Sequence, residues 1–387
     1  MSSSPRILSI YGTRPEAIKM APLIKAIEAD STLESVVLVT AQHREMLDQV
    51  NELFGIHPDR DLDVMAKGQS LNQITARVIQ GVDKALVDLA PDAVVVQGDT
   101  TTVMASAIAA FNRSIPVIHL EAGLRSGDLF NPFPEEANRK LTGQIASLHL
   151  APTEGSKQNL LDDGISSNAI AVTGNTVIDA LQLAVEMKVE PEDQLTRDYL
   201  EATGQKVLVT THRRENLGRS MENIGEALKE LAVGRPDVTF LFPAHKNPLV
   251  REAVLPRVMH CPNVLVTEPV SYGAFTTVIN ASDIVLTDSG GIQEEAPSLA
   301  KPVLVMRENT ERPEAVDAGT VDLIGTDRGR IVDAVTKLLD DKEHYAGMAQ
   351  AVNPYGDGKA AQRSVLAIKH MFGLSDLPRD FAWKVEA

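Results

Sequence analysis

Short apolar runs alternate with helix-length amphipathic segments along the whole chain. The runs are almost unbroken in Val, Ile and Leu, which is typical of parallel strands covered by helices on both faces. The expected strands span residues 6–10, 36–40, 93–97, 116–120, 148–151 and 170–173 in the first half, and 206–210, 238–242, 264–267, 283–287, 303–306 and 321–324 in the second.

This alternation predicts an α/β chain with two Rossmann-like, doubly wound domains that face each other across a cleft. The strand pattern stops near residues 174–200, where the segment 186–197 is charged and contains a proline. We therefore expect an N-terminal Rossmann-like domain at 1–175 and a C-terminal Rossmann-like domain at 176–365. A C-terminal helix at about 366–387 is expected to pack back onto the first domain. A length of 387 residues suits two domains of ordinary size.

Composition narrows the class of protein. Hydrophobic residues make up 43% of the chain and charged residues 23%, as in soluble globular proteins. No apolar run approaches the ~18 residues of a membrane span, and the start has no apolar signal segment. We therefore expect a cytoplasmic protein without a membrane partner. The net charge of −16 disfavours nucleic acid. One cysteine, Cys261, and scattered histidines predict no disulfide and no metal site.

Charged residues follow nearly every predicted strand, at the carboxyl ends where open α/β sheets bind ligands. The most informative case is the stretch 288–295, Asp-Ser-Gly-Gly-Ile-Gln-Glu-Glu. A strand that turns through Ser-Gly-Gly into a helix presents backbone N–H groups and a helix dipole to an anion. Glu294 or Glu295, one turn further on, can reach sugar hydroxyls. The stretch therefore predicts a nucleotide-sugar site, although Ser-Gly-Gly alone would favour an ordinary strand-to-helix turn.

The first strand is followed by residues 12–16, Gly-Thr-Arg-Pro-Glu. Thr13 and Glu16 have the spacing of a capping box, and proline is tolerated in a first helical turn. A well-capped helix explains these residues but not Arg14, a cation at the positive end of a helix dipole. Arg14 therefore indicates an anionic ligand. Lys19, in the same helix, fits a solvated surface lysine nearly as well as a ligand contact.

Carboxylates end two neighbouring strands. Asp99 and Glu121 follow adjacent expected strands, and Glu135 and Glu136 stand at an expected helix start. Carboxylates that approach closely shift each other's pKa and can act as acid and base. Asp99 could instead cap a helix, and Glu135 could be an ordinary first-turn charge. Glu121 has no capping role and is the strongest candidate.

His212 lies at another strand end, flanked by Arg213 and Arg214. A phosphate contact or proton transfer is as plausible there as a structural role. The chain has no G-x-G-x-x-G fingerprint, no Walker A motif and no G-x-S-x-G elbow. NAD binding is therefore not supported, and we expect no cofactor.

Together these segments resemble the non-hydrolysing UDP-N-acetylglucosamine 2-epimerases. The resemblance implies the glycosyltransferase-B fold and a homodimer. It also implies reversible conversion of UDP-N-acetylglucosamine into UDP-N-acetylmannosamine for surface polysaccharide synthesis. The matching stretches cover almost the whole chain and are GTRPEAIKMAPL, TAQHREMLDQ, QGDTTT, HLEAGLRSGD, PFPEEANRKL, GNTVIDAL, THRRENLG, SGGIQEEAPSL and RENTERPEAVDAGT.

The resemblance also implies residue roles. Catalysis falls to Asp99, Glu121, Glu135 and His212. Some members bind a second UDP-N-acetylglucosamine as an activator, and parts of that site match Gln42, Arg213 and His245. Two departures are Glu45, where some allosteric members carry glutamine, and Val270, where some relatives have a polar residue near the uracil. Substrate contacts fall to Arg14, Lys19, Phe275, Ser289, Gly290, Gly291, Glu295 and Arg312.

The chemistry of the reaction restricts the route. C2 of an N-acetylhexosamine has no adjacent carbonyl, so direct removal of its hydrogen is too difficult. Breaking the bond from C1 to UDP develops positive charge at C1 and acidifies C2–H. The products are 2-acetamidoglucal and bound UDP, and readdition with protonation from the other face gives the epimer. The alternatives are a hydrolysing epimerase that releases UDP, a glycosyltransferase on the same fold, and a non-catalytic sensor, which the carboxylates disfavour.

Overall fold

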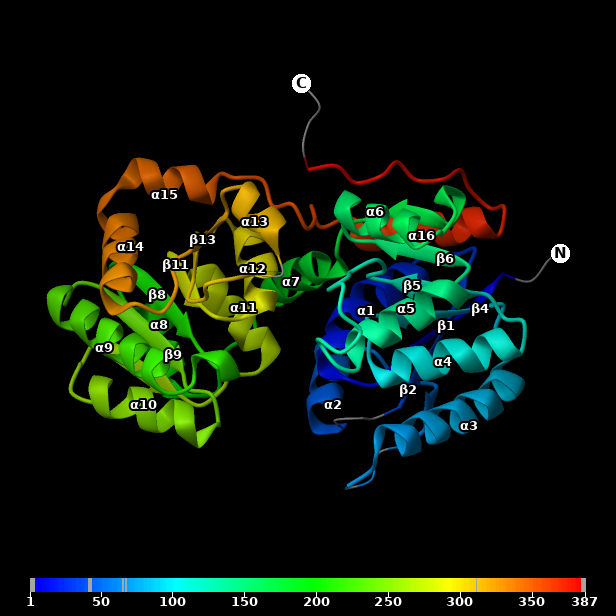
Figure 1. Ribbon diagram of the computed structural model, residues 1–387, viewed down its shortest axis with the longest axis horizontal. Helices are drawn as coiled ribbons and strands as arrows, with labels where there is room; N and C mark the ends of the chain where they lie inside the picture. The colour runs from blue at the N-terminus through cyan, green and yellow to red at the C-terminus, as the bar shows by residue number, and fades with distance from the viewer. Residues whose placement is uncertain (1–3, 41–43, 65, 67, 311, 384–387) are drawn as a thin grey trace. The chain divides into compact units, whose positions relative to one another are not determined.

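The computed structural model describes residues 4–40, 44–64, 66, 68–310 and 312–383. The chain forms two compact units (Figure 1). Unit 1 holds the residues up to Leu183 together with those from Tyr355 onward, and unit 2 is Ala184–Pro354. The divisions thus follow Leu183 and Pro354, whereas the sequence pattern places them after residues 175 and 365.

Unit 1 is built on a seven-stranded parallel sheet with the order β3-β2-β1-β4-β5-β6-β7. The order runs outward in both directions from β1, which is the doubly wound arrangement. β3 was not expected from the sequence, because its two residues are both exposed and carry no apolar run. The strands are β1 (Arg6–Tyr11), β2 (Glu34–Val39), β3 (Arg60–Asp61), β4 (Ala93–Gln97), β5 (Val117–Leu120), β6 (Leu148–Ala151) and β7 (Ile170–Val172).

Two groups of helices cover this sheet. Helix α4 packs against α3 and α5, and α1 packs against α2 and α16 (Figure 1). Buried Leu8, Ile10, Val78 and Val96 belong to the core between the sheet and α3. The helices are α1 (Arg14–Glu28), α2 (Arg44–Leu53), α3 (Leu71–Leu89), α4 (Thr101–Asn112), α5 (Glu135–Ile145), α6 (Glu154–Asp162), α7 (Thr176–Met187) and α16 (Ala360–Met371). The division between the units falls within α7, after Leu183.

The last helix differs from the expectation of a helix at about 366–387. α16 begins six residues earlier, at Ala360, and ends at Met371. Gly373, with a φ of 69°, takes a left-handed conformation that ends the helix. Residues 372–383 contain neither helix nor strand. Lys369 Nζ of α16 lies 2.8 Å from Asp30 Oδ2, which ties this helix to the chain just after α1.

Unit 2 repeats the arrangement with a six-stranded parallel sheet, ordered β10-β9-β8-β11-β12-β13. Met221 and Leu228 of α9 pack with Phe240 and Phe242 in its core. The strands are β8 (Lys206–Thr210), β9 (Thr239–Pro243), β10 (Val264–Thr267), β11 (Ile284–Thr287), β12 (Val303–Val305) and β13 (Val321–Leu323). The helices are α8 (Gln194–Glu201), α9 (Arg219–Gly234), α10 (Pro248–Val258), α11 (Tyr272–Ala281), α12 (Gly290–Glu295), α13 (Pro313–Asp317), α14 (Arg328–Asp340) and α15 (Lys342–Ala349).

The predicted strands are all confirmed, with ends that differ by at most two residues. Because every strand in each sheet is parallel to its neighbours, the carboxyl ends lie along one edge of each unit. The predicted site residues follow those ends. Among the described residues, no helix is both long enough and apolar enough to cross a lipid bilayer.

Candidate active site

Glu121 directly follows β5 and has a left-handed backbone conformation, with a φ of 61°. For a residue other than glycine this conformation costs roughly 1–3 kcal/mol, and it is found most often at functional sites. The Glu121 carboxylate accepts hydrogen bonds from Lys19 of α1 and Gln97 of β4, and from Asn175 Nδ2 at 3.1 Å. The side chain is only 8% exposed. These donors orient the carboxylate and stabilise its negative charge.

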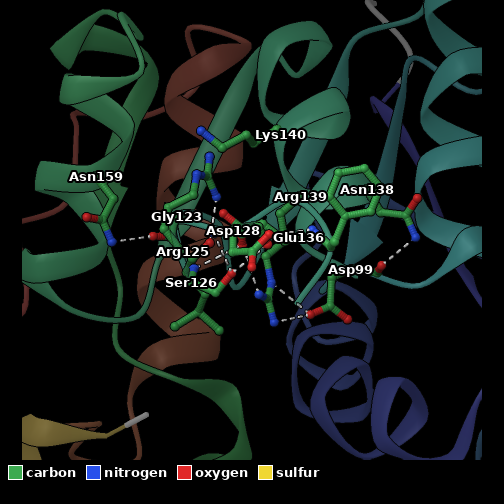
Figure 2. A network of polar contacts seen from close by, with 12 residues as sticks. Asp99, Gly123, Arg125, Ser126, Asp128, Glu136, Asn138, Arg139, Lys140 and Asn159 are labelled. Carbon is green, nitrogen blue, oxygen red and sulfur yellow. Dashed lines mark hydrogen bonds and ion pairs between the residues drawn. The ribbon is translucent and has the colours of Figure 1, made fainter. Parts of the chain in front are cut away.

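Asp99, beyond the end of β4, is bound by a guanidinium group from α5. Arg139 Nε and Nη2 lie 2.9 and 2.6 Å from Asp99 Oδ2 (Figure 2). Arg139 Nη1 also lies 3.1 Å from Oε2 of the buried Glu136. Burial lowers the pKa of Arg139, but its two carboxylate partners outweigh that effect and raise the pKa above its usual value. The residue that caps α4 is Thr100, so the alternative of Asp99 as the cap is wrong.

Glu135 is the first residue of α5, as expected, and is half-buried. The helix dipole favours a carboxylate there. Within the described ranges, Glu135 forms no ion pair, unlike Asp99 with Arg139 and Glu121 with Lys19. The three predicted carboxylates of unit 1 therefore have different electrostatic surroundings.

The start of α1 has the predicted capping box. Thr13 Oγ1 accepts from the Glu16 backbone N at 3.4 Å, and Glu16 Oε2 accepts from the Thr13 and Gly12 backbone N atoms at 2.9 and 2.6 Å. Glu16 also accepts from Thr100 Oγ1, which joins the loops after β1 and β4. Burial raises the pKa of Glu16. Arg14, next to this buried network, is exposed.

In unit 2, Asp288 at the end of β11 is a buried centre of hydrogen bonds. Its carboxylate accepts from Thr211 Oγ1 at 2.7 Å, from the backbone N atoms of His212 and Arg213 at 3.0 Å, and from Asn216 Nδ2 at 3.0 Å. Burial alone would raise the pKa of Asp288, but these donors and the His212 ring outweigh it and lower the pKa to about 2. Asp288 therefore remains a carboxylate.

His212 is oriented by that carboxylate. Its Nδ1 lies 3.3 Å from Asp288 Oδ1, and its side chain is 38% exposed. An imidazole held by a carboxylate at Nδ1 has its other nitrogen, Nε2, available for a ligand or a proton. The His245 ring lies 5.7 Å from that of His212. Burial, and then the charge of His212, lower the pKa of His245.

Two guanidinium groups lie against the glycine turn that begins α12. A Cβ atom on Gly290 would lie 2.7 Å from Arg312 Nη1 and 3.3 Å from Arg213 Nη2. Arg312 Nε also lies 2.5 Å from Glu294 Oε1. Cations beside the N–H groups of such a turn form an anion site. The anion site at this turn stays a prediction, and the two guanidinium groups beside Gly290 support it.

The remaining predicted contacts lie on the helices around this turn. Glu295 Oε1 accepts from Tyr272 Oη at 3.1 Å. Burial, and then Glu295, raise the pKa of Tyr272 well above its usual value. Phe275 is half-buried on α11, three residues beyond Tyr272. Gln42 lies outside the described residues, as does the side chain of Glu45.

Three residues that position the predicted groups were not identified from the sequence. They are Arg139, Asn175 and Asp288, whose partners Asp99, Glu121 and His212 lie 40, 54 and 76 positions away. Helix and strand periodicities report only near neighbours. All three lie within or directly beside stretches that carry the family resemblance, and that is the available signal.

A family model described as UDP-N-acetylglucosamine 2-epimerase matches residues 25–369. The chain belongs to the UDP-N-acetylglucosamine 2-epimerase family. The UDP-N-acetylglucosamine 2-epimerase of Escherichia coli K12 is 52% identical over 371 residues, which is 94% of this chain and 98% of that relative. The predicted family is therefore confirmed.

Solved structures of UDP-N-acetylglucosamine 2-epimerases are also similar to this chain over nearly its whole length. The UDP-GlcNAc 2-epimerase of Neisseria meningitidis bound to UDP-GlcNAc has a TM-score of 0.83 and 46% identity, covering 95% of this chain and 100% of that one. Staphylococcus aureus MnaA with UDP has a TM-score of 0.87 and 44% identity, covering 98% and 100%. The predicted fold class, two Rossmann-like domains of the glycosyltransferase-B type, is confirmed.

Proposed function

We propose that this enzyme is a non-hydrolysing epimerase that interconverts UDP-N-acetylglucosamine and UDP-N-acetylmannosamine through 2-acetamidoglucal. The main support is the contrast between its two groups of strand-end residues. Unit 1 has carboxylates paired with cations, and unit 2 has cations beside a glycine turn. The reaction needs a proton acceptor at the sugar and a cationic site for the departing diphosphate.

In this proposal, the bond from C1 to the UDP oxygen breaks and its electron pair leaves with UDP. Arg312, Arg14 and the Ser289–Gly291 turn stabilise that charge. His212, held by Asp288, adds a cation or a proton at the diphosphate. Phe275 and Glu295 contact the nucleoside, as the resemblance implies.

The electrons of the C2–H bond then form the C1–C2 double bond, and the proton passes to a carboxylate. Glu121 and Asp99, with Lys19 and Arg139 beside them, suit that acceptor role and the stabilisation of positive charge at C1. Glu135 has no ion-pair partner among the described residues, which suits a group that carries and returns a proton. Protonation of C2 from the opposite face and readdition of UDP complete the epimerisation.

Product analysis separates this proposal from a hydrolysing epimerase. Prolonged incubation with UDP-N-acetylglucosamine should give a stable mixture of the two UDP-sugars. Anion-exchange chromatography of the reaction mixture measures both. Stoichiometric release of UDP and free N-acetylmannosamine would instead identify a hydrolysing enzyme. A glycosyltransferase would leave UDP-N-acetylglucosamine unchanged until an acceptor is added.

The family resemblance also supports a cytoplasmic homodimer and activation by a second UDP-N-acetylglucosamine at Gln42, Arg213 and His245. Light scattering should then give a mass of twice the 41.8 kDa chain. A monomer mass at micromolar concentration would remove the dimer from the proposal.

A further inference from the structure

Asn175 lies immediately before α7, the helix through which the chain passes from unit 1 into unit 2, and is 4% exposed. Its side chain bonds in two directions. Oδ1 accepts from the Val177 backbone N at 3.1 Å, and Nδ2 donates to Glu121 Oε1 at 3.1 Å. Its backbone N donates to the carbonyl oxygen of Tyr355 at 2.7 Å. Tyr355 is the first residue of the segment in which the chain returns to unit 1, called the returning segment below. One residue therefore contacts the outgoing helix, the returning segment and the predicted catalytic carboxylate.

The direction of the amide follows from its partners. The Val177 N–H requires an acceptor, so the oxygen of Asn175 faces α7 and the NH2 group faces Glu121. An aspartate could fill the same capping position, because both residues are good caps. Only the amide also offers a donor to Glu121. The hydrogen bond to Glu121 therefore explains why this position holds asparagine and not aspartate.

Lys19 and Gln97, elsewhere in unit 1, also donate to Glu121. Lys19 has a long, flexible side chain, and Gln97 ends β4. Asn175 has a short side chain whose orientation is already fixed by the helix cap. It is therefore the donor best able to set the direction of a carboxylate whose own backbone is in the left-handed region.

The outgoing and returning segments are closely packed around Asn175. A Cβ atom on Gly356 would lie 3.1 Å from Ile178 Cγ1 and 3.4 Å from Asn175 O. Asp179 of α7 accepts from the backbone N atoms at the start of α16, Ala360 and Ala361, at 3.2 and 2.9 Å. A displacement of the returning segment therefore reaches Asn175 through direct contacts.

We propose that Asn175 is a positioning residue that holds Glu121 in its reactive orientation and ties it to the two segments by which the chain passes between the units. This inference rests on the proposed catalytic role of Glu121. Asn175 acts through Glu121 and is not itself assigned a contact with the substrate.

The decisive variant is Asn175→Asp, which keeps the cap and replaces the donor with a second carboxylate. We expect thermal stability close to that of the wild type and a fall in kcat of at least about tenfold at pH 7. The acid limb of the pH–kcat profile should move to higher pH, because a neighbouring negative charge makes Glu121 harder to ionise. Asn175→Ser keeps a capping side chain but has no donor that reaches Glu121. It should give a smaller loss of kcat and a smaller shift of the acid limb than Asn175→Asp.

Two comparators make the outcome unambiguous. Asp327→Asn exchanges carboxylate and amide at the exposed cap of α14 and should leave kcat and the pH profile unchanged. Glu121→Gln tests the premise separately. If Glu121→Gln is inactive while Asn175→Asp keeps the wild-type kcat and pH profile, the positioning role is refuted. If Asn175→Asp does not fold, the same readouts on Asn175→Ser decide. If Glu121→Gln is fully active, the proposed role of Glu121 has failed instead.

A glycine pair tests the tie to the returning segment. Gly356→Ala should lower kcat a few-fold, because its methyl group presses on Ile178 and Asn175. Gly347→Ala on α15 has open space around the new methyl group and should have no effect on kcat. Equal kcat values for the two variants would overturn this part of the inference.

Discussion

The six strands of unit 2 follow the same order as the first six strands of unit 1, but the two units differ in the chemistry of their strand ends. In unit 1, Glu121 and Asp99 each face a cation from a neighbouring helix. In unit 2, the carboxylate of Asp288 accepts hydrogen bonds from the loop after β8. Arg213 and Arg312 lie against the turn at Gly290. The same succession of strands therefore carries ion-paired carboxylates in one unit and cations beside a glycine turn in the other. The difference between the units lies in the loops after the strands and not in the sheet.

The histidines differ in the same way. His119 and His149 are buried in adjacent strands of unit 1, and burial lowers their pKa values to about 4 and about 3. His212 in unit 2 is partly exposed and is oriented by Asp288. A histidine that is neutral and buried serves packing, whereas one that is held by a carboxylate and open to solvent is available for chemistry.

The largest expected effect is in unit 1. Glu121→Gln preserves shape but removes the charge that Lys19 balances, so kcat should fall by ~10²–10⁴-fold. UDP binding, assigned to unit 2, should remain, as calorimetry would show. The exposed Glu28→Gln on α1 is the matched control. A Glu121→Gln enzyme within a few-fold of wild type would move the chemistry to Asp99 or Glu135.

The buried histidines should make unit 1 sensitive to acid. In the unfolded chain their pKa values return to about 6.5, so the unfolded chain binds more protons between pH 6.5 and 4. Stability is therefore full above about pH 6.5 and is lost as the pH falls toward 4. Each histidine contributes a loss on the order of 3 kcal/mol.

Unfolding in urea at several pH values measures this effect. His149→Leu should flatten the dependence between pH 6.5 and 4, while His57→Asn, at an exposed position, should not. An equally steep loss of stability in His149→Leu would show that buried histidine does not cause the acid sensitivity.

In unit 2, Arg312→Ala should weaken UDP binding and kcat/KM by about 1.5–3 kcal/mol, the range of a charge-assisted hydrogen bond. The fold should be little affected. Arg328→Ala removes an exposed arginine of the same unit and serves as the control. Unchanged UDP affinity in Arg312→Ala would refute the assignment of the diphosphate to the Gly290 turn.

The smallest expected effect concerns regulation. Starting from UDP-N-acetylmannosamine alone, the reverse reaction should be slow and should accelerate when a little UDP-N-acetylglucosamine is added. Glu45 stands where some allosteric members carry glutamine, and a carboxylate disfavours an anionic activator, so the acceleration should be weak. Glu45→Gln should strengthen the acceleration. Arg213→Ala should abolish it. Hyperbolic kinetics that none of these changes affects would exclude a working second site.

The fold was largely predictable because strands buried on both faces leave unbroken apolar runs. β3 left no such run, and the end of α16 depends on Gly373, one glycine among many. Local parts of the site were also predictable. The capping box of Thr13 and Glu16 and the turn at Gly290 depend on residues a few positions apart.

The orientation of the reactive groups was not predictable. Asn175 and Asp288 act on residues more than 50 positions away, and only the packed structure brings those pairs together. The left-handed conformation of Glu121 leaves no trace in the sequence, because the residue is not glycine. These features depend on tertiary packing and not on local pattern.

The central claim is that carboxylates of unit 1 remove and return the C2 proton while UDP is detached. Incubation with UDP-N-acetylglucosamine in deuterium oxide, without added NAD, tests it directly by NMR. We predict reversible epimerisation with deuterium at C2 of UDP-N-acetylmannosamine and, at equilibrium, of UDP-N-acetylglucosamine as well. Epimerised product that retains protium at C2 would contradict the elimination mechanism.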